Sequence, residues 1–285
     1  MRTLKLTIAY DGTRFVGWQR QAEGTSIQGL LEEALARFEG APVTVHGAGR
    51  TDAGVHALGQ VASTVVACHH DVTTLLRALN AQLPEDVRLV RIEEVPPGFH
   101  ARFSARSKSY RYVIRNAATG DPFDRGYTWH VPEPLDLAAM RQAARALIGT
   151  HDFAVFQSTG SSVGSTVRTI FRSELLVAPP ANGLDLWDQP LSIRRGMTQG
   201  QAKQQVRDKD PTESAPPEAR LIAYEVAGDG FLRHMVRAIV GTLMEIGRGR
   251  RQPEDIGKLL VGGVRSDAGV TAPSHGLCLV GVVYD

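Results

Sequence analysis

The sequence predicts an α+β protein made of two halves of similar size. Strand-like and helix-like patterns alternate along the whole chain of 285 residues, which favours mixed layers of helices and sheet. With 42% hydrophobic residues, a chain of this length can bury one or two cores of ordinary domain size. The 29 glycines indicate many tight turns.

The first half begins with a strand followed by a helix. Leu4, Leu6 and Ile8 alternate with other residues as in a half-buried strand, which ends at the turn signal of residues 11–12. Thr25 with Gln28 three positions later has the form of a capping box, and a helical apolar stripe follows. The further elements expected here are a strand near 43–45, a strand near 61–66, a helix around 75–79 and a strand near 89–95.

The second half opens with a strong strand pattern at 110–114. The elements expected after it are a helix at about 137–148, strands near 170–177 and 221–226, a helix around 235–243, a short helix after Pro253 and a final strand at 279–284. We expect a division into domains 1–105 and 106–285. Residues 188–218 are rich in glutamine, charge and proline, so we interpret them as a mobile insertion that catalysis does not need.

The overall charge does not by itself indicate a polyanionic partner. Lysine and arginine total 32 against 30 acidic residues, so any nucleic-acid surface must come from locally segregated charge. Cys68 and Cys278 show no pairing pattern, which favours a reducing, cytoplasmic environment over a disulfide scaffold. The first residues lack the apolar run of a signal peptide, and no stretch is long enough to suggest a membrane span.

A glycine-rich segment between two expected strands is the candidate for chemistry. It comprises residues 46–56, HGAGRTDAGVH, at a position where a turn is expected. Its glycines leave room for a planar substrate to approach the chain. Arg50 and Asp52 are two positions apart, so on extended backbone they can point the same way and form an ion pair that holds the carboxylate ionised.

Two less specific interpretations of this segment compete with a catalytic role. Glycine-rich turns with a single aspartate are common purely structural features. A dinucleotide-binding loop is disfavoured because the third glycine is missing at the required spacing and the segment leads toward a strand instead of a helix.

The whole string resembles the signature of the tRNA pseudouridine synthase A family. Residues 49–56, GRTDAGVH, match the family core without interruption. Further similarities occur in the family's order: 10–13 (YDGT) with Phe15, Gly17 and Trp18, then 100–105 (HARFSA), 110–112 (YRY), 230–237 (GFLRHMVR), 271–273 (TAP) and 276–277 (GL). The resemblance therefore covers nearly the entire chain.

The resemblance implies specific roles for four residues. Asp52 would be the catalytic nucleophile, Arg50 would help hold a flipped base, Tyr110 would pack on the uracil and Arg237 would pair with Asp52. The implied reaction breaks the bond from ribose C1′ to uracil N1 and joins C1′ to C5, in the anticodon stem and loop at tRNA positions 38, 39 and 40. Attack at uracil C6 and attack at C1′ are both compatible with the sequence.

The resemblance also implies an architecture and a partner. Two α+β subdomains would join their mostly antiparallel sheets into one central sheet, with helices on the outer face and the active-site cleft between them. The family is homodimeric on tRNA, and the reaction needs no cofactor because nothing is oxidised, reduced or hydrolysed.

Additional substrate contacts are expected on both sides of the tyrosine motif. The densest basic stretch comprises Arg102, Arg106, Lys108, Arg111 and Arg115. Alternation places Tyr110 on one strand face and Arg111 with Arg115 on the other, so the strand could address base and phosphates, or core and solvent. We take Arg102, Arg111 and His56 as candidate substrate-binding residues.

A second aspartate lies in a similar string. Residues 266–270 (SDAGV) repeat much of 51–55, but the preceding Gly-Ala-Gly-Arg is missing, so we expect Asp267 to serve in a turn. Residues 262–265 (GGVR) stand where the family more commonly has a lysine, which puts a basic RNA contact there in doubt. Cys68 with His69 and His70 has no second ligand pair at zinc-site spacing, so no metal site is expected.

Two other functions are compatible with the sequence. A non-catalytic tRNA-binding or chaperoning protein on the same scaffold would bind tRNA without its Asp52 carboxylate. An N-glycoside hydrolase would place a carboxylate near C1′ and release free uracil.

Overall fold

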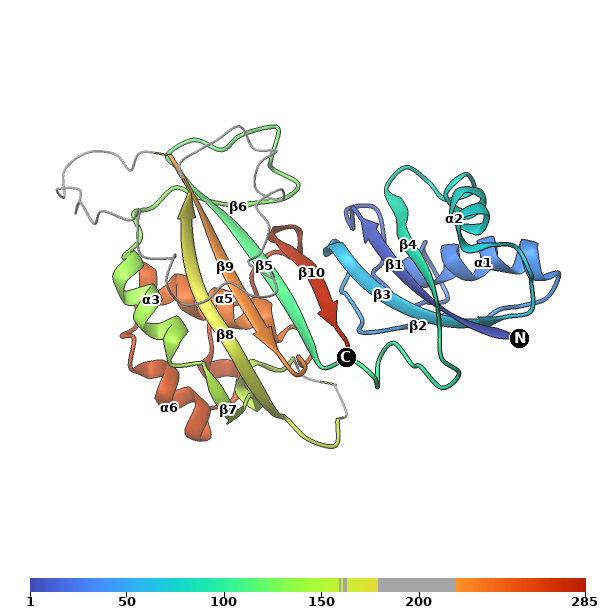
Figure 1. Ribbon diagram of the computed structural model, residues 1–285. Coiled ribbons are helices and arrows are strands. Elements are labelled where there is room, and N and C mark those ends of the chain that lie inside the picture. The colour runs from blue at the N-terminus through green and yellow to red at the C-terminus, as the bar shows by residue number, and fades with distance from the viewer. Residues whose placement is uncertain (159, 161–162, 179–218) are drawn as a thin grey trace, which may run out of the picture.

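The computed structural model describes residues 1–158, 160, 163–178 and 219–285, and the expected insertion at 188–218 lies outside these residues (Figure 1). The strands and helices of the first half are β1 (Arg2–Tyr10), α1 (Ile27–Glu39), β2 (His46–Gly47), β3 (His56–Val66), α2 (Val72–Asn80) and β4 (Val87–Val95). No helix of the described residues is long and apolar enough to cross a membrane.

The second half contains more elements than the first. They are β5 (Ser107–Asn116), β6 (Trp129–Val131), α3 (Leu137–Arg145), β7 (Gly149–Asp152), η1 (Ala154–Phe156), β8 (Val167–Ala178), β9 (Arg220–Gly228), α5 (Met235–Gly247), α6 (Asp255–Gly262), η2 (Arg265–Asp267), η3 (Ser274–Gly276) and β10 (Leu277–Val283). Helix α5 is apolar on nearly all sides and almost wholly buried, as expected for a helix in the centre of a core.

One continuous sheet joins the two halves, in the order β4-β1-β3-β10-β5-β9-β8-β7. The last strand of the chain closes the junction, because β10 pairs in parallel with β3, at Cys278 opposite His56, and antiparallel with β5 (Figure 1). Among the described strands, β5 with β6 is the other parallel pair. The predicted single, mostly antiparallel central sheet is confirmed.

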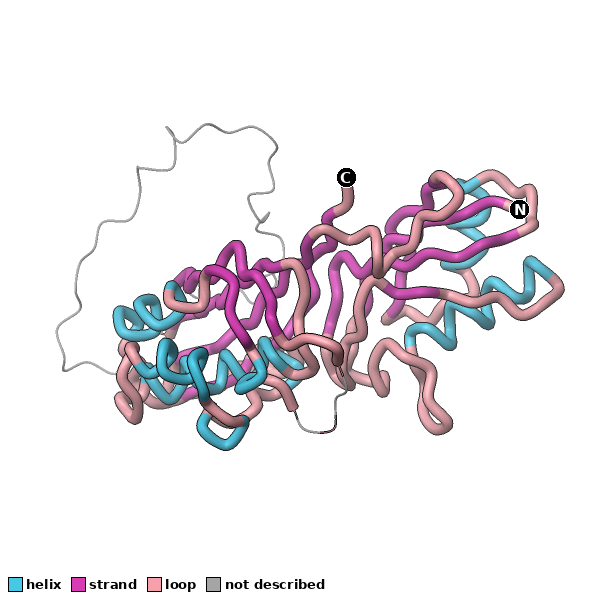
Figure 2. Tube along the Cα trace, turned by 90° about the horizontal axis from the view of Figure 1, so that it is seen from below, coloured by secondary structure: helices cyan, strands magenta, loops and turns pink. Residues whose placement is uncertain are grey.

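The helices gather on one side of this sheet. Figure 2 shows α3, α5 and α6 on the same side of the strands as α1 of the other half. A cleft between the two halves is lined by Gln28 at the start of α1 and by Met235 at the start of α5. The cleft therefore opens on the helix-bearing face, between the two halves.

Two expectations about the first half are wrong for identifiable reasons. The N-cap of α1 is Ser26 and not Thr25, because Ser26 has extended backbone and its side chain accepts a hydrogen bond from the Gly29 N–H. Residues 43–45 form no strand. The Val45 carbonyl accepts from the Gln28 amide and the Val45 N–H donates to Glu32, so α1 side chains satisfy this backbone instead of a neighbouring strand.

Candidate active site

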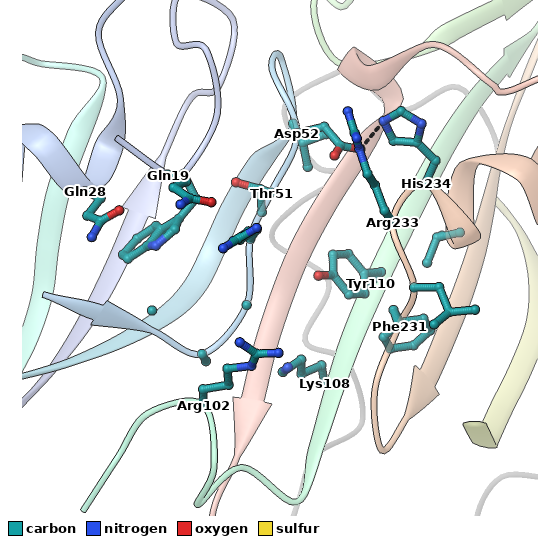
Figure 3. Close-up of a pocket in the computed structure, with 18 of the residues that line it drawn as sticks. Gln19, Gln28, Thr51, Asp52, Arg102, Lys108, Tyr110, Phe231, Arg233 and His234 are labelled. Carbon is teal, nitrogen blue, oxygen red and sulfur yellow. Dashed lines mark ion pairs between the residues drawn. The ribbon is translucent and has the colours of Figure 1, made fainter. Parts of the chain in front are cut away.

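The loop between β2 and β3 carries Asp52 into a large cleft. The cleft has a volume of about 1500 Å³, and residues from both halves line it, including Arg237. Figure 3 shows Asp52, Tyr110 and His234 among them. Residues of the loop from Gly47 to Ala53 form one wall, and Phe231 to Arg237 form the opposite wall. Residues 185 positions apart in sequence thus meet at one site.

The segment from Tyr10 to Trp18 forms hydrogen bonds to the Asp52 loop at Thr51. The Tyr10 hydroxyl lies 2.8 Å from Thr51 Oγ1, and the Trp18 N–H donates to the Thr51 carbonyl at 3.0 Å. Gly17 has φ +109°, and a Cβ there would lie 2.6 Å from the Thr51 carbonyl oxygen, so only glycine fits this contact. The first family motif therefore acts as a support for the second.

A buried glutamine fixes the other end of the loop. Gln60 on β3 has no exposed surface, and its side-chain amide donates to the Gly49 carbonyl at 3.0 Å. Sequence patterning did not single out Gln60. A fully buried amide is costly to leave unsatisfied, so this bond restrains the backbone next to Arg50.

The Asp52 carboxylate is held through one of its two oxygens. Oδ2 lies 3.2 Å from Arg237 Nη1 and 3.4 Å from His234 Nε2. The pairing of Arg237 with Asp52 that the resemblance implies is therefore present. Among the described residues both of these contacts use Oδ2, which leaves Oδ1 available to a substrate.

Arg50 does not form the ion pair with Asp52 that its spacing suggested. Its exposed side chain lines the same cleft, while Arg237 and His234 take the carboxylate. Arg50 is therefore placed to meet a ligand and not to neutralise Asp52.

Arg237 is itself positioned by the chain near the C-terminus. Its Nε donates to the Ala272 carbonyl at 2.8 Å, and the Ala272 N–H donates to the Arg237 carbonyl at 3.1 Å. Arg237 lies in the first turn of α5, where the helix dipole also favours a nearby anion such as the Asp52 carboxylate. The Thr-Ala-Pro segment thus aims the guanidinium at the carboxylate.

His234 is the N-cap of α5 and has an unusual backbone. With φ 61°, it is the one non-glycine residue at positive φ in the described part of the chain. Burial lowers the pKa of its imidazole, which keeps the ring neutral near pH 7 although Asp52 opposes this shift. A neutral ring that accepts from the Ser158 hydroxyl at Nδ1 can donate from Nε2 to Asp52. Strained backbone of this kind is typical of functional sites.

Tyr110 of β5 lies at the floor of the cleft. It is 8% exposed, and Phe231 packs against it edge-on with the ring centroids 5.0 Å apart. Burial raises the pKa of the Tyr110 hydroxyl, so the side chain stays protonated. Figure 3 places Tyr110 with Asp52 and His234 on one side and Arg102 and Lys108 on the other.

Positive charge is segregated into the cleft, as a nucleic-acid surface requires. The lining cations are Arg20, Arg50, Arg102, Lys108, Arg233 and Arg237. Asp52 is the single acidic residue among the described residues that line it. Lys108 is partly buried beside Arg102, and burial followed by this neighbouring charge lowers the pKa of its ammonium to about 8. The low net charge of the chain therefore conceals a strongly basic cleft.

Comparison with known proteins fits this arrangement. The family model described as tRNA pseudouridine synthase matches residues 6–104 and 143–285. The chain belongs to this family. A protein of Syntrophotalea carbinolica named tRNA pseudouridine synthase A is 40% identical over all of this chain and 97% of its own length. Equally named proteins of Solidesulfovibrio magneticus and Exiguobacterium are 42% and 40% identical over all of this chain, and over 92% and 99% of their own lengths.

Two residues of the synthase motifs lie away from the cleft. Arg111 is 4% exposed and forms a buried ion pair with Glu225 at 2.6 Å, so a phosphate contact would have to break that pair. His56 is also buried, where its Nδ1 accepts from the Gly12 N–H at 3.0 Å. Alternation correctly separated Arg111 from Tyr110, but Arg111 is buried and pairs with its cross-strand neighbour Glu225 of β9 instead of facing solvent.

Asp267 has the turn role expected for it. Its Oδ2 accepts from the Val264 N–H at 2.8 Å within η2, and its side chain is exposed. The neighbouring Arg265 donates to the Gly269 carbonyl and to Thr271, so this guanidinium fixes the loop. Among the described residues, no group of three or more His, Cys, Asp or Glu side chains is placed to hold a metal ion.

Proposed function

We propose that the protein isomerises uridine to pseudouridine in the anticodon stem and loop of tRNAs, with Asp52 as the nucleophile. The observation that carries this proposal is the Asp52 carboxylate, held through Oδ2 by Arg237 and His234 at the wall of an otherwise cationic cleft. The names of the curated relatives supply the substrate class, tRNA.

The geometry supports base flipping. A uridine within a stacked stem must leave the helix before a carboxylate can reach it. The Tyr110 ring, backed edge-on by Phe231, offers an apolar face to the uracil, and Arg50 is exposed beside Asp52 to hydrogen-bond the base. Such contacts replace the stacking and pairing that the flipped base loses.

The carboxylate is prepared for nucleophilic attack. Two donors on Oδ2 fix the rotamer of Asp52, so Oδ1 can approach C6 or C1′ of the target nucleotide. After the C1′–N1 bond breaks, the detached uracil must stay in the site until C5 faces C1′. When the C1′–C5 bond forms, C5 loses its proton and N1 gains one. The half-enclosed floor at Tyr110 helps retain the base and exclude water, which would otherwise divert the reaction to hydrolysis.

Pseudouridine formation on defined RNA tests this function. Unmodified tRNA transcripts with uridines in the anticodon arm would be incubated with the protein, digested to nucleosides and separated by chromatography. We expect pseudouridine in place of uridine and no free uracil. Free uracil would indicate an N-glycoside hydrolase, and tight binding without either product would indicate the non-catalytic tRNA-binding protein.

A homodimer in the cytoplasm completes the proposal and rests on the family resemblance. An anticodon arm lies far from the rest of a tRNA, so a second subunit would extend the surface that meets its phosphates. Light scattering at micromolar concentration tests the dimer: a mass of two chains is expected, and a mass of one chain would contradict it.

A further inference from the structure

Three stacked rings lie along one rim of the cleft. His46, at the start of β2, stacks on His100 with ring centroids 4.9 Å apart and planes at 30°. His100 in turn lies 4.4 Å from the Phe103 ring at 37°. All three residues line the cleft that contains Asp52. The rings therefore connect the catalytic loop to the loop that follows β4.

Hydrogen bonds to Ser63 and Tyr284 hold the loop that carries Phe103. Ala101 has no exposed surface, its N–H donates to the Ser63 hydroxyl at 3.0 Å, and its carbonyl accepts from the Tyr284 hydroxyl at 2.7 Å. The Ser104 N–H also donates to the His100 carbonyl at 2.9 Å, which closes a tight turn around Phe103. The position of the Phe103 ring is therefore set by a restrained backbone.

The Phe103 ring is nevertheless 77% exposed. A single exposed phenylalanine is common on protein surfaces and needs no explanation by itself. Phe103 differs because its ring packs on His100, while the Arg102 guanidinium lies over the ring, 5.7 Å from its centroid. An aromatic face beside cations is the combination that single-stranded RNA binders use for base stacking and phosphate contact.

The chemistry of the rim favours a nucleobase over an apolar peptide. Apart from Asp52, the described lining of the cleft carries only positive or neutral side chains. His100 accepts the Arg102 N–H at its Nδ1, and burial together with His46 lowers the pKa of its imidazole. The row of rings is thus neutral at His100 and has the Arg102 cation over Phe103.

This rim is separate from the position of the target uracil. Figure 3 shows Arg102 and Lys108 across Tyr110 from Asp52 and His234. A base stacked beside Arg102 therefore belongs to a different nucleotide from the one that Asp52 attacks. Given the proposed function, which places RNA in this cleft, we propose that Phe103, backed by His100 and His46, is a stacking site for an unpaired nucleobase that flanks the target uridine.

A fluorescent base analogue tests the stacking directly. Anticodon stem-loop RNAs would carry 2-aminopurine at one loop position at a time, and emission would be compared on wild type, Phe103→Ala, Phe103→Leu and Phe103→Trp. Phe123→Ala is the matched control, because Phe123 is 91% exposed and does not line the cleft. Circular dichroism checks that each variant is folded.

We expect quenching at one loop position on wild type and on Phe103→Trp, and its loss on Phe103→Ala and Phe103→Leu. The affinity of the two non-aromatic variants should fall about 5- to 150-fold, the range for removing one base–aromatic stack. The Phe123→Ala variant should match wild type. Phe103→Leu separates stacking from packing, because it keeps an apolar side chain without a π face.

Failure of this inference is distinguishable from failure of the proposed function. Wild type that forms pseudouridine while no loop position responds to Phe103 substitution overturns the stacking site alone. Wild type that shows Phe103-dependent quenching but never forms pseudouridine overturns the proposed function and leaves the stacking site standing.

Discussion

The chemistry of the site depends on how one carboxylate oxygen is held. Arg237 and His234 both contact Oδ2 of Asp52, and each is fixed by a further bond, to the Ala272 carbonyl and to Ser158. The residue that the sequence suggested for this task, Arg50, lies two positions from Asp52 but points into the cleft. The true partner is 185 positions away and could be named only through the family resemblance.

Arg237→Gln should slow turnover without unfolding the protein. The change removes a charge-assisted hydrogen bond to Asp52, which is worth about 1.5–3 kcal/mol and corresponds to a fall in turnover of about 10- to 150-fold. Single-turnover pseudouridine formation measures the effect. The control is Arg106→Gln, whose exposed ion pair with Asp285 lies outside the cleft. Equal rates for both variants would contradict the role of Arg237.

RNA affinity should fall as pH rises through about 8 because of Lys108. Its pKa of about 8 in the free protein means that the ammonium loses its charge in this range, and a bound phosphate would raise that pKa. The Lys108 charge therefore contributes fully to RNA binding below about pH 8. This contribution is lost as the pH rises from there through the higher pKa of the complex. Lys108→Arg stays charged, so its dissociation constant should change less between about pH 7 and 9. If the dissociation constants of wild type and Lys108→Arg changed equally with pH, this role of Lys108 would be contradicted.

At the scale of elements, the position of the Asp52 loop depends on the segments that support it. Patterning located most strands and helices, because their apolar periodicity is local. It misplaced the strand near 43–45, since only the folded structure brings Val45 to the Gln28 and Glu32 side chains of α1. It also could not show that Arg111 pairs with Glu225, which lies 114 positions later on β9.

Gly17→Ala should damage both stability and activity, because its Cβ would meet the Thr51 carbonyl. Gly40→Ala is the matched control: Gly40 also has positive φ, at 68°, but a Cβ there would meet open space. We expect a loss of about 1 kcal/mol in unfolding free energy for Gly40→Ala and clearly more for Gly17→Ala. Only Gly17→Ala should also slow pseudouridine formation. Chemical denaturation measures the unfolding free energy, and an activity assay measures the rate of pseudouridine formation. Equal losses in the two variants would show that the Gly17 contact does not support the loop.

At the scale of the whole molecule, the last strand makes two halves into one sheet. The halves and their α+β character were predictable from alternating patterns, whereas the insertion of β10 between β3 and β5 was not, because pairing partners so distant leave no local signal. The cleft lies against this junction, with Leu277 of β10 in its lining. Sheet continuity therefore sets the distance between Asp52 and the α5 residues.

Leu279→Ala should weaken this junction strongly. Leu279 is fully buried in β10 opposite Ala57 of β3, so its truncation should cost about 2–5 kcal/mol of unfolding free energy. Val283→Ala on the same strand, at a position 39% exposed, should cost less than about 1 kcal/mol. Urea unfolding of both variants measures the difference. Equal, small losses would show that β10 does not hold the halves together.

The most direct test of Asp52 as the nucleophile is tritium release from tRNA that carries 5-³H-uridine in the anticodon arm. Wild type and Asp267→Asn should release tritium, because Asp267 serves only the turn at η2. Asp52→Asn should fold and bind tRNA but release none. Release by Asp52→Asn at the wild-type rate would contradict the assignment of Asp52 as the nucleophile, and loss of release in a folded Asp267→Asn would contradict the turn role of Asp267.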